Sequence, residues 1–432
     1  MIAIIADDLS SATDCGVQML SGGFRVVVPL QSCSRIPEGV DVISFHTDSR
    51  AMSGKDAYRA TKACLRDRAL SPPTVFYKSV DSTLRGNPGA EIDAILDSGF
   101  FDAAVVAPAF PTYGRTTTAG CQFVHGVPLD ETEFASDPTM PVTTSSIAGR
   151  IAEQCSRPAT SIALEAQCRE QTVLYRLIED QLRRGVQIFI FDAETEDDLE
   201  KIAMSAAALP YRLLWVGSTG LSRYVPKAIG LSPGSRPSVI KVKSGSVLIV
   251  AGSASERTRD QLNVFDGDEN FCEIQISALS VASGGKEARA EISRAQHRLG
   301  LALAENIHMI ALTLTSSRSE ISEASTLASA RGMAPEKLSA ILVDTLGRLT
   351  ANAVGAGAPI MGLVLTGGDT ANALMVALGA DLIEIIEEVE PGIPLGLAMG
   401  QYDTLIVTKA GGFGSEMSLV KSVQRIEAYA GE

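Results

Sequence analysis

IAIIADDLSSATD, residues 2–14, is a short apolar run that ends in two adjacent carboxylates, Asp7 and Asp8. The run predicts a buried strand over Ile2–Ile5, and the hydroxyl-rich residues after it predict the start of a helix. Ligands of parallel sheets bind beyond the carboxyl ends of the strands. The two carboxylates could there accept hydrogen bonds from sugar hydroxyls, hold a cation or act as a base. The alternative is that one of them only caps the following helix.

Similar apolar runs alternate with helical segments along the 432-residue chain, which is typical of a parallel α/β sheet. A segment rich in Ser, Pro and Gly separates two series of strands and predicts a linker. We therefore expect an α/β fold of two domains, each with a largely parallel sheet flanked by helices, over residues 1–230 and 246–432, with a linker over 231–245. We expect an irregular surface segment or an interdomain arm over Gly114–Ser145. The further strands are expected at Arg25–Pro29, Val40–Phe45, Val75–Lys78, Ala103–Ala107, Gln187–Phe191, Leu213–Val216, Ser246–Val250, Glu273–Ile276, His308–Leu312, Gly362–Leu365 and Thr404–Val407.

Composition narrows the class of protein. The formal charge of −14 opposes binding to nucleic acids and to anionic membranes, and one Trp with 5% aromatics argues against stacking surfaces for single-stranded nucleic acid. No run approaches the ~18 apolar residues of a membrane-spanning helix, and the first apolar run is too short for a signal peptide. The seven Cys form no CxxC pair, which indicates reduced thiols and disfavours a zinc site. We expect a soluble cytoplasmic protein with small-molecule partners, and homo-oligomerisation is left open.

Two more polar clusters follow expected strands in the first half. FHTDSRAMS carries Arg50, whose planar guanidinium suits a carboxylate, although a surface arginine is the alternative. VFYKSVDSTLRGNPGAE carries Lys78, Asp81, Ser82 and Arg85 within eight residues. Such a set suits a polyhydroxylated acid. Lys78 and Arg85 could bind its carboxylate, and Asp81 could accept a hydrogen bond from one of its hydroxyls. The alternative is a salt-bridged surface loop.

Three strand–turn–helix units with small residues in the turn occur in the second half. Backbone N–H groups at helix N-termini favour phosphate, and paired glycines allow a close approach of the backbone. Together the three units predict a nucleotide phosphate site, although each alone is weak. The chain has no GxxxxGK[ST] motif, and no GxGxxG follows a strand, which disfavours a P-loop and a dinucleotide dehydrogenase. The turns supply Gly252, Ser253 and Ser255, then Gly367, Gly368, Asp369 and Thr370, then Lys409, Gly411 and Gly412.

This combination of motifs resembles the four-carbon acid sugar kinase family over essentially the whole chain. The resemblance rests on IADDLSSATD, DSR, KSVDSTLRGNPGAE, APAFPTYGRTTTAG, VGSTGL, AGSASERTRDQL, LTGGDTANAL and KAGGFGSE. Members of that family are two-domain enzymes that phosphorylate threonate, erythronate or 3-oxo-tetronate with ATP. The resemblance implies an acid-sugar domain over residues 1–230, an ATP domain over 246–432 and catalysis between them, with ATP and Mg²⁺ as cofactors.

Carried over by position, the resemblance implies two groups of site residues. The substrate group is Asp7, Asp8, Arg50, Lys78, Asp81, Ser82 and Arg85, and the ATP group is Ser253, Ser255, Gly367, Gly368, Asp369, Thr370, Gly411 and Gly412, with Lys409 added as a candidate for phosphate charge. Arg50, Lys78 and Arg85 would fix the substrate carboxylate. Asp369 and Asp8 are alternative catalytic bases, and no metal ligands are assigned.

One departure from the family pattern concerns the first motif, which is usually ADDFTGA and here reads ADDLSSA. Ser10 keeps the usual hydroxyl, whereas Ser11 replaces a glycine and could tighten the turn. The following DCGVQ leans towards threonate kinases. We therefore expect phosphorylation of the 4-hydroxyl of D-threonate. The alternatives are D-erythronate, 3-oxo-tetronate or a longer aldonate as substrate, or a non-catalytic ligand sensor on the same fold.

Overall fold

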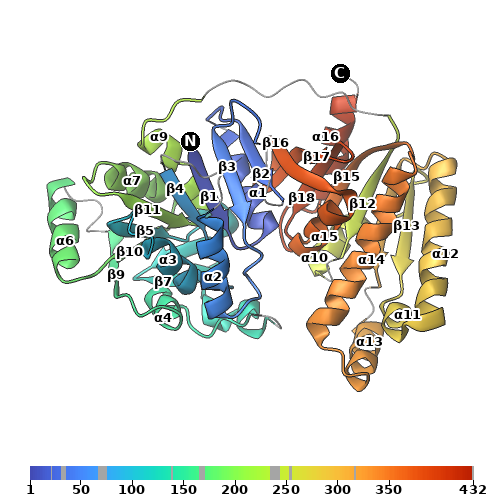
Figure 1. The fold of residues 1–432 in the computed structure, drawn as a ribbon, viewed down its shortest axis with the longest axis horizontal. Coiled ribbons are helices and arrows are strands. Elements are labelled where there is room, and N and C mark those ends of the chain that lie inside the picture. The colour runs from blue at the N-terminus through green and yellow to red at the C-terminus, as the bar shows by residue number, and fades with distance from the viewer. Residues whose placement is uncertain are drawn as a thin grey trace. The chain divides into compact units, whose positions relative to one another are not determined.

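The computed structural model describes residues 1–432 except 21, 31–35, 67–74, 138–139, 165–170, 234–243, 253–254, 316–317 and 431–432. The chain divides into two compact units, Met1–Arg236 (unit 1, blue to yellow-green in Figure 1) and Pro237–Glu432 (unit 2, yellow to red). Most of the predicted linker over 231–245 lies outside the described residues. Among the described helices, none has the length and apolar character needed to cross a membrane.

Unit 1 is built on a parallel sheet in the order β2-β3-β1-β4-β11-β5-β10-β9. Its strands are mostly apolar because helices cover both faces, and every residue of β1 is buried. Ile2 of β1 lies opposite Val42 on one side and Val75 on the other. The strands are β1 (Ile2–Ala6), β2 (Val26–Pro29), β3 (Val42–His46), β4 (Val75–Ser79), β5 (Ala103–Ala107), β9 (Ala159–Ile162), β10 (Ile188–Phe191) and β11 (Leu213–Gly217).

The helices of unit 1 begin at residues that suit helix N-termini. Ser53 precedes α2 and its hydroxyl accepts a hydrogen bond from the Asp56 N–H, and Thr195 forms a capping box with Asp198 at α7.

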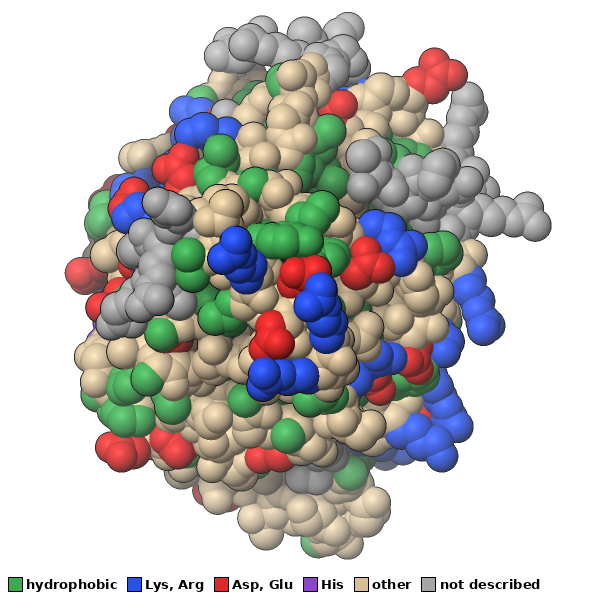
Figure 2. Space-filling view, turned by 90° about the vertical axis from the view of Figure 1, so that its left-hand side faces the viewer, with side chains coloured by type: hydrophobic (Ala, Val, Ile, Leu, Met, Phe, Trp, Pro, Cys, Tyr) green, Lys and Arg blue, Asp and Glu red, His purple; other side chains and the backbone are tan. Residues whose placement is uncertain are grey.

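On the face drawn in Figure 2, basic and acidic side chains are interspersed rather than sorted by sign. The helices are α1 (Leu9–Leu20), α2 (Gly54–Cys64), α3 (Pro88–Leu96), α4 (Ile147–Ala152), α6 (Gln171–Arg183), α7 (Glu196–Ala207), α8 (Thr219–Ser222) and α9 (Val225–Ala228).

A small antiparallel sheet stands where we expected irregular structure. The strands β6 (Arg115–Thr118), β7 (Cys121–Val124) and β8 (Val127–Pro128) occupy residues 115–128, so the expectation is wrong there. The turn between β6 and β7 has two residues with positive φ, Ala119 and Gly120. The buried carboxylate of Asp192 accepts both of their N–H groups, at 2.9 and 2.8 Å. Because this support comes from a distant part of the chain, the local sequence does not reveal the hairpin.

Unit 2 carries a second sheet, in the order β13-β14-β12-β15-β18-β17-β16. The first five strands are parallel, and the hairpin of β16 and β17 adds two antiparallel strands that the sequence did not predict. The strands are β12 (Ser246–Ala251), β13 (Phe271–Ile276), β14 (Met309–Leu314), β15 (Ile360–Thr366), β16 (Ala380–Glu390), β17 (Ile393–Gly400) and β18 (Thr404–Lys409). The helices are α10 (Glu256–Asn263), α11 (Ala278–Ser283), α12 (Gly285–Ala304), α13 (Arg318–Ala330), α14 (Pro335–Gly355), α15 (Gly368–Leu378) and α16 (Ser418–Ala430).

The two units begin with the same topology. In each, the first four strands of the sheet lie in the order second, third, first, fourth: β2-β3-β1-β4 in unit 1 and β13-β14-β12-β15 in unit 2. The chain therefore changes direction across the sheet at β1 and at β12, and such switch points are where open α/β sheets bind ligands. The predicted fold class is confirmed: an α/β protein with two largely parallel sheets flanked by helices (Figure 1).

Candidate functional site

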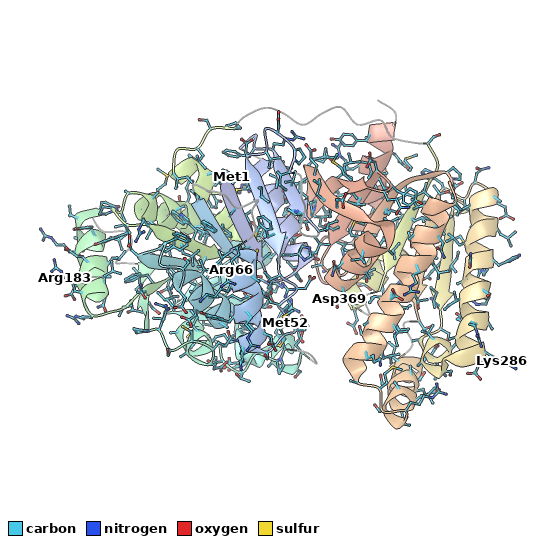
Figure 3. The ribbon with its side chains drawn as sticks, in the orientation of Figure 1. Met1, Met52, Arg66, Arg183, Lys286 and Asp369 are labelled. Atoms are coloured by element: carbon cyan, nitrogen blue, oxygen red, sulfur yellow. The ribbon has the colours of Figure 1, made fainter. Side chains whose placement is uncertain are left out.

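A charged cluster lies at the carboxyl ends of three neighbouring strands of unit 1. Asp7 and Asp8 follow β1, Arg50 follows β3, and Asp81 and Arg85 follow β4. Because β1 pairs with both β3 and β4, these side chains come together although they are far apart in sequence. Met52, labelled in Figure 3, marks the connection from β3 to α2.

Arg50 joins the two carboxylates of the first motif. Its Nε and Nη2 donate to the two oxygens of Asp7 at 2.7 and 2.9 Å, and its Nη1 pairs with Asp8. Nη2 also donates to the hydroxyl of Ser11 at 2.8 Å, and the Ser11 N–H donates to Asp8 at 2.7 Å. Burial lowers the pKa of Arg50, but the two carboxylates outweigh it and raise that pKa well above its usual value. Burial raises the pKa of Asp8, although Arg50 acts against the shift.

Asp81 and Arg85 form the second part of the cluster. Arg85 Nε and the Thr83 hydroxyl both donate to one Asp81 oxygen at 2.6 Å, and Arg85 also pairs with Asp137 at 3.3 Å. The guanidinium of Arg85 lies over the ring of Phe134, 5.3 Å from its centre. Burial would raise the pKa of Asp81, but Arg85 and Arg50 hold it far below its usual value. The two parts of the cluster are close, because a Cβ on Gly86 would lie 3.2 Å from an Asp7 oxygen and 3.6 Å from the Arg50 Cα.

Lys78 lies in the interior of unit 1. Its side chain is 0% exposed, and its Nζ pairs with Glu91 at 2.9 Å and donates to the Ser79 and Ile5 carbonyls at 2.7 and 3.2 Å. The Ser49 hydroxyl donates to the same Glu91 carboxylate. The Lys78 ammonium is thus enclosed by protein groups in this structure, whereas the side chains of Arg50 and Arg85 are 25% and 27% exposed. Ser82, also in the expected substrate group, is 6% exposed.

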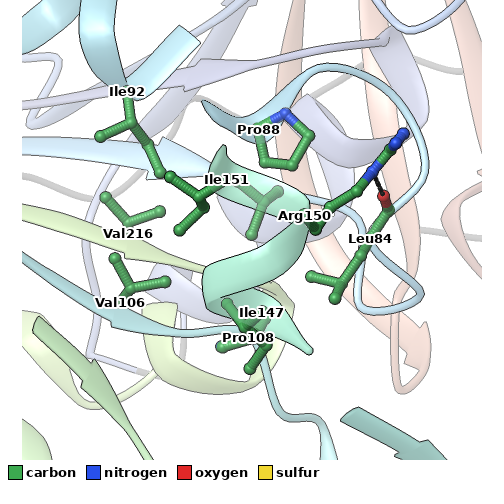
Figure 4. A pocket seen from close by; sticks show the side chains of 10 residues that line it. Leu84, Pro88, Ile92, Val106, Pro108, Ile147, Arg150, Ile151 and Val216 are labelled. Atoms are coloured by element: carbon green, nitrogen blue, oxygen red, sulfur yellow. Dashed lines mark hydrogen bonds between the residues drawn. The ribbon is translucent and has the colours of Figure 1, made fainter. Parts of the chain in front are cut away.

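The loop after β4 is held in place from below by Arg150 of α4. Arg150 Nε donates to the Leu84 carbonyl at 3.2 Å, and its Nη2 donates to the Gly86 carbonyl at 2.9 Å. Gln154 donates to the same Gly86 carbonyl at 3.0 Å. Both Leu84 and Gly86 have positive φ, so these bonds stabilise an unusual backbone path. Figure 4 shows the bond to Leu84 at the edge of an apolar cavity.

The small sheet of unit 1 supports the same loop. Gln122 of β7 is fully buried, donates to the Ser82 carbonyl at 2.8 Å and accepts a hydrogen bond from Thr117 of β6 at 2.7 Å. The carbonyls of residues 82, 84 and 86 are therefore all bound to the scaffold, while Asp81, Thr83 and Arg85 bond to one another. Sequence reasoning missed Gln122, Arg150 and Gln154, because no local pattern links them to partners 40 to 68 residues away.

A buried thiol lies beside the last residue of β4. Cys15 of α1 is 0% exposed, and its Sγ is 3.1 Å from the Ser79 hydroxyl and 3.9 Å from that of Thr219. Burial raises the pKa of this thiol to about 12. Cys15 is therefore a protonated, unreactive thiol in the folded protein.

In unit 2 the three small turns follow the adjacent strands β12, β15 and β18. The hydroxyls of Ser255 and Thr258 both donate to the Gly411 carbonyl at 3.0 Å, which joins the first turn to the third. The Gly367 N–H donates to the Lys409 carbonyl at 2.9 Å, which joins the second to the third. The structure thus brings the three turns together. Ser253 lies outside the described residues.

The turn between β15 and α15 has a backbone that favours glycine. Gly367 has a φ of 97°, and Gly368 begins α15. Asp369 is exposed in the first helical turn (Figure 3) and Thr370 is buried. A Cβ on Gly252 would lie 2.2 Å from the Thr370 hydroxyl, so the turn after β12 approaches this helix as closely as only glycine permits. The first N–H groups of α15 have no partners within the helix and favour an anion.

Lys409 supports the third turn from inside. It is 1% exposed, and its Nζ donates to the Gly411 carbonyl at 3.3 Å. Gln261 of α10 donates to the Phe413 and Ser415 carbonyls at 3.1 and 2.7 Å, which fixes the residues after Gly412. Sequence reasoning missed Thr258 and Gln261. Their positions in the first and second helical turns of α10, just after a loop of small residues, could have indicated that they contact a neighbouring loop.

Glu390, at the end of β16, holds the far side of the third turn. Its carboxylate accepts the N–H and hydroxyl of Ser415 at 2.9 and 2.6 Å, the hydroxyl of Ser418, and pairs with Lys421. Burial opposes ionisation, but these donors lower the pKa of Glu390 to about 2. The turn is thus held between α10 on one side and β16 on the other.

Metal-binding side chains are sparse in both units. Within the described part of the chain, no group of three His, Cys, Asp or Glu residues is arranged to hold a metal ion. The carboxylates of unit 1 are paired with arginines, whereas Asp369 is exposed beside the hydroxyl of Thr370. This donor set fits Mg²⁺ only where phosphate oxygens complete the coordination, as is usual for nucleotide-bound Mg²⁺.

Comparison with known proteins agrees with this division of chemistry. The model of a sugar-binding N-terminal domain matches residues 2–225, and that of a nucleotide-binding C-terminal domain matches residues 248–419. Two solved structures share the fold: a Salmonella typhimurium LT2 protein (TM-score 0.79, 20% identity, 98% of both chains) and a Haemophilus influenzae protein (TM-score 0.71, 21% identity, 98% of this chain and 99% of that one).

Curated relatives extend over the full length. The D-threonate kinase of Salmonella typhimurium is 36% identical and covers 99% of both chains. The D-erythronate kinase of Heliobacterium modesticaldum is 30% identical over 96% of this chain and 94% of its own. The 3-oxo-tetronate kinase of Pseudomonas savastanoi pv. phaseolicola is 26% identical over 100% of this chain and 98% of its own. The chain therefore belongs to the four-carbon acid sugar kinase family.

Proposed function

We propose that this chain is an ATP-dependent kinase that phosphorylates the 4-hydroxyl of a four-carbon sugar acid, with D-threonate as its substrate. The observation that carries the proposal is that one chain has both a charged cluster at the strand ends of unit 1 and three small turns at the strand ends of unit 2. The full-length similarity to a D-threonate kinase supports this choice of substrate. D-Erythronate and 3-oxo-tetronate are the alternatives, because relatives that act on them match over a similar length.

Unit 1, within residues 1–230, binds the sugar acid in this proposal. Asp81 and Asp8 accept hydrogen bonds from its hydroxyls, since both carboxylates are held at the strand ends by arginines. Asp7 keeps Arg50 in place. Lys78 acts from the interior by neutralising Glu91, and so supports the ends of β3 and β4.

Unit 2, within residues 246–432, binds ATP. The N–H groups of Gly368, Asp369 and Thr370 at the start of α15, and those around Gly411 and Gly412, face the phosphates, and Ser255 keeps the first and third turns together. Mg²⁺ bound to the ATP phosphates would supply charge neutralisation, and this proposal assigns no side chain to it, because Asp369 is kept for the proton. Lys409 adds positive charge beneath the third turn.

Asp369 is the catalytic base in this proposal. The oxygen of the substrate hydroxyl forms a bond to the γ-phosphorus, the bond from that phosphorus to the ADP oxygen breaks, and the hydroxyl proton passes to the Asp369 carboxylate. Asp369 is exposed, whereas both oxygens of Asp8, the alternative base, are engaged by Arg50 and the Ser11 N–H. Within the described residues the Asp369 carboxylate accepts no hydrogen bond, which makes it the better proton acceptor.

We also infer a cytoplasmic location and small-molecule partners, and homo-oligomerisation remains open. Among the described residues, Cys15, Cys121, Cys155 and Cys272 are free thiols, as expected in a reducing compartment. The net charge of −14 disfavours nucleic acids and anionic membranes as partners.

An ADP-release assay with ATP, Mg²⁺ and a panel of acids tests the function. The panel is D-threonate, D-erythronate, 3-oxo-tetronate and a longer aldonate. We expect ADP release that depends on the acid and is fastest with D-threonate, and ³¹P–¹³C coupling in the product at C4. Thermal stabilisation by D-threonate without ADP release would instead support the non-catalytic sensor.

A further inference from the structure

Three arginines of unit 1 interact electrostatically with Asp81, and one of them, Arg85, forms an ion pair with it at 2.6 Å. Arg50 and Arg85 were expected there, and Arg115 is the third. Asp81 acts electrostatically on the pKa of each of them, and Arg85 acts on that of Arg115. Arg115 is thus part of the charged cluster, although it comes from the small sheet rather than from an end of the parallel strands.

Arg50 and Arg85 each already pair with two carboxylates. Each carboxylate lies within 3.3 Å of a guanidinium nitrogen, so the positive charge of both arginines is balanced by the protein itself. A substrate carboxylate at either arginine would compete with these partners. The pairs are Arg50 with Asp7 and Asp8, and Arg85 with Asp81 and Asp137.

Arg115 has no ion pair within the described residues. Its Nη1 donates to the Tyr113 carbonyl, and its Nε is buried without a hydrogen-bond partner in that same part of the chain. Glu133 acts on it electrostatically without forming an ion pair. Burial is the main cause that lowers the pKa of Arg115. A buried N–H without an acceptor destabilises the protein, and this one is at the edge of a guanidinium that suits a carboxylate.

The orientation of Arg115 follows from its strand. Residues two apart in a strand share a face, so Arg115 lies on the same face of β6 as Thr117. Thr117 bonds to Gln122, which in turn bonds to the Ser82 carbonyl in the loop of the cluster. The face of β6 that carries Arg115 is therefore joined to this loop by hydrogen bonds.

We infer that Arg115 binds the carboxylate of the sugar acid. The inference rests on the proposed function and reassigns the role first expected of Arg50, Lys78 and Arg85. The substrate carboxylate supplies the acceptor that Arg115 Nε lacks and the negative charge that its guanidinium lacks. Arg50 and Arg85 then hold Asp8 and Asp81 in place for the substrate hydroxyls.

The test compares Arg115→Met and Arg115→Lys with the unchanged chain on two substrates. One is D-threonate, and the other is threitol, a neutral polyol that lacks the carboxylate. We expect Arg115→Met to raise the KM for D-threonate about 10- to 100-fold, as for loss of a hydrogen bond between charged groups, with a smaller change in kcat. The KM for ATP and the low kcat/KM for threitol stay within about twofold, and Arg115→Lys recovers part of the loss.

Arg183→Met is the matched control, because Arg183 is exposed on α6 and, among the described residues, forms one ion pair, with Glu179 (Figure 3). Equal losses on D-threonate and threitol would overturn the inference, since they indicate a structural role. An unchanged KM for D-threonate in Arg115→Met would overturn it too, while leaving the kinase function intact. Should Arg115→Met fail to fold, the KM values of Arg115→Lys for the same two substrates decide between a binding role and a structural role. If the unchanged chain releases no ADP with any acid, the proposed function itself fails.

Discussion

The two units begin with the same strand order and end their strands in opposite ways. At the ends of β1, β3 and β4, unit 1 places charged side chains that pair with one another. At the ends of β12, β15 and β18, unit 2 places glycines and hydroxyls, and the contacts between its turns end on backbone carbonyls. One topology thus supports two kinds of site.

The difference corresponds to the ligands in the proposal. A sugar acid offers several hydroxyls and one charge, so its site needs oriented acceptors, and carboxylates held by arginines provide them. A triphosphate offers many acceptors, so its site needs donors, and exposed N–H groups at a helix start provide them. We therefore expect unit 1 to be sensitive to single side chains and unit 2 to be sensitive to its backbone.

The largest expected effect tests an exception to this rule, the side chain of Asp369. We expect Asp369→Asn to lower kcat about 10²- to 10⁴-fold with the KM for ATP nearly unchanged, because an amide cannot accept the proton. Asp381→Asn, at an exposed position on β16, is the control. If instead Asp8→Asn causes the loss, Asp8 is the base. Burial raises the pKa of Asp8, so kcat would then fall with decreasing pH at a value above the ordinary 3.8, where the carboxyl becomes protonated.

The second prediction concerns the interior of unit 1. Lys78→Met leaves the Glu91 carboxylate buried without its cation, and we expect the free energy of unfolding to fall by about 3–5 kcal/mol. Adding Glu91→Gln should restore part of the loss, because the uncompensated charge is removed. Urea unfolding measures both. Lys227→Met, which breaks an exposed pair with Glu200, should change the free energy by no more than about 1 kcal/mol. A Lys78→Met chain of unchanged stability would argue against a structural role.

The third prediction tests whether unit 2 depends on its backbone. Gly367→Ala places a Cβ at a φ of 97°, which costs about 1–3 kcal/mol and disturbs the start of α15. We expect the KM for ATP to rise about tenfold and the KM for D-threonate to stay constant. Gly300→Ala, inside α12 with open space around its Cα, should be neutral or stabilising. An unchanged KM for ATP in Gly367→Ala would contradict a phosphate site at this turn.

The smallest expected effect concerns Ser11, which stands where the family usually has glycine. Ser11→Ala removes the hydroxyl that accepts a hydrogen bond from Arg50, a bond worth about 0.5–1.5 kcal/mol. We expect the KM for D-threonate to change severalfold. Ser11→Gly separates hydroxyl from backbone effects: the same change in both variants assigns it to the hydroxyl, and a change in Ser11→Gly alone assigns it to the backbone.

The sequence predicted the parallel strands and the grouping of the strand-end motifs, because apolar runs and strand ends are local features. It missed β16, whose acidic ADLIEIIEEVE segment does not follow the pattern of a buried parallel strand, and it missed the hairpin partner β17. It also missed the hairpin of β6 and β7, which depends on Asp192.

Within the candidate site, the residues directly after strands could be predicted and their supports could not. Lys78 and Asp8 both lie within two residues of the end of a strand, so the sequence treats them alike. Only the packing of α3 reveals that the Lys78 ammonium is paired with Glu91 in the interior. Arg115 and Arg150 acquire their place from tertiary contacts with the loop after β4, and no spacing in the sequence encodes those contacts.

The buried thiol of Cys15 provides a chemical probe for local opening of unit 1. Because it is fully buried and protonated, a thiol reagent can modify it only when α1 separates from the sheet, so the labelling rate measures the population of that open state. A ligand bound to the charged cluster of unit 1 would slow the labelling of Cys15 in proportion to the affinity of that ligand. Cys64, Cys121 and Cys272, which are partly exposed, provide the unprotected reference within the same chain.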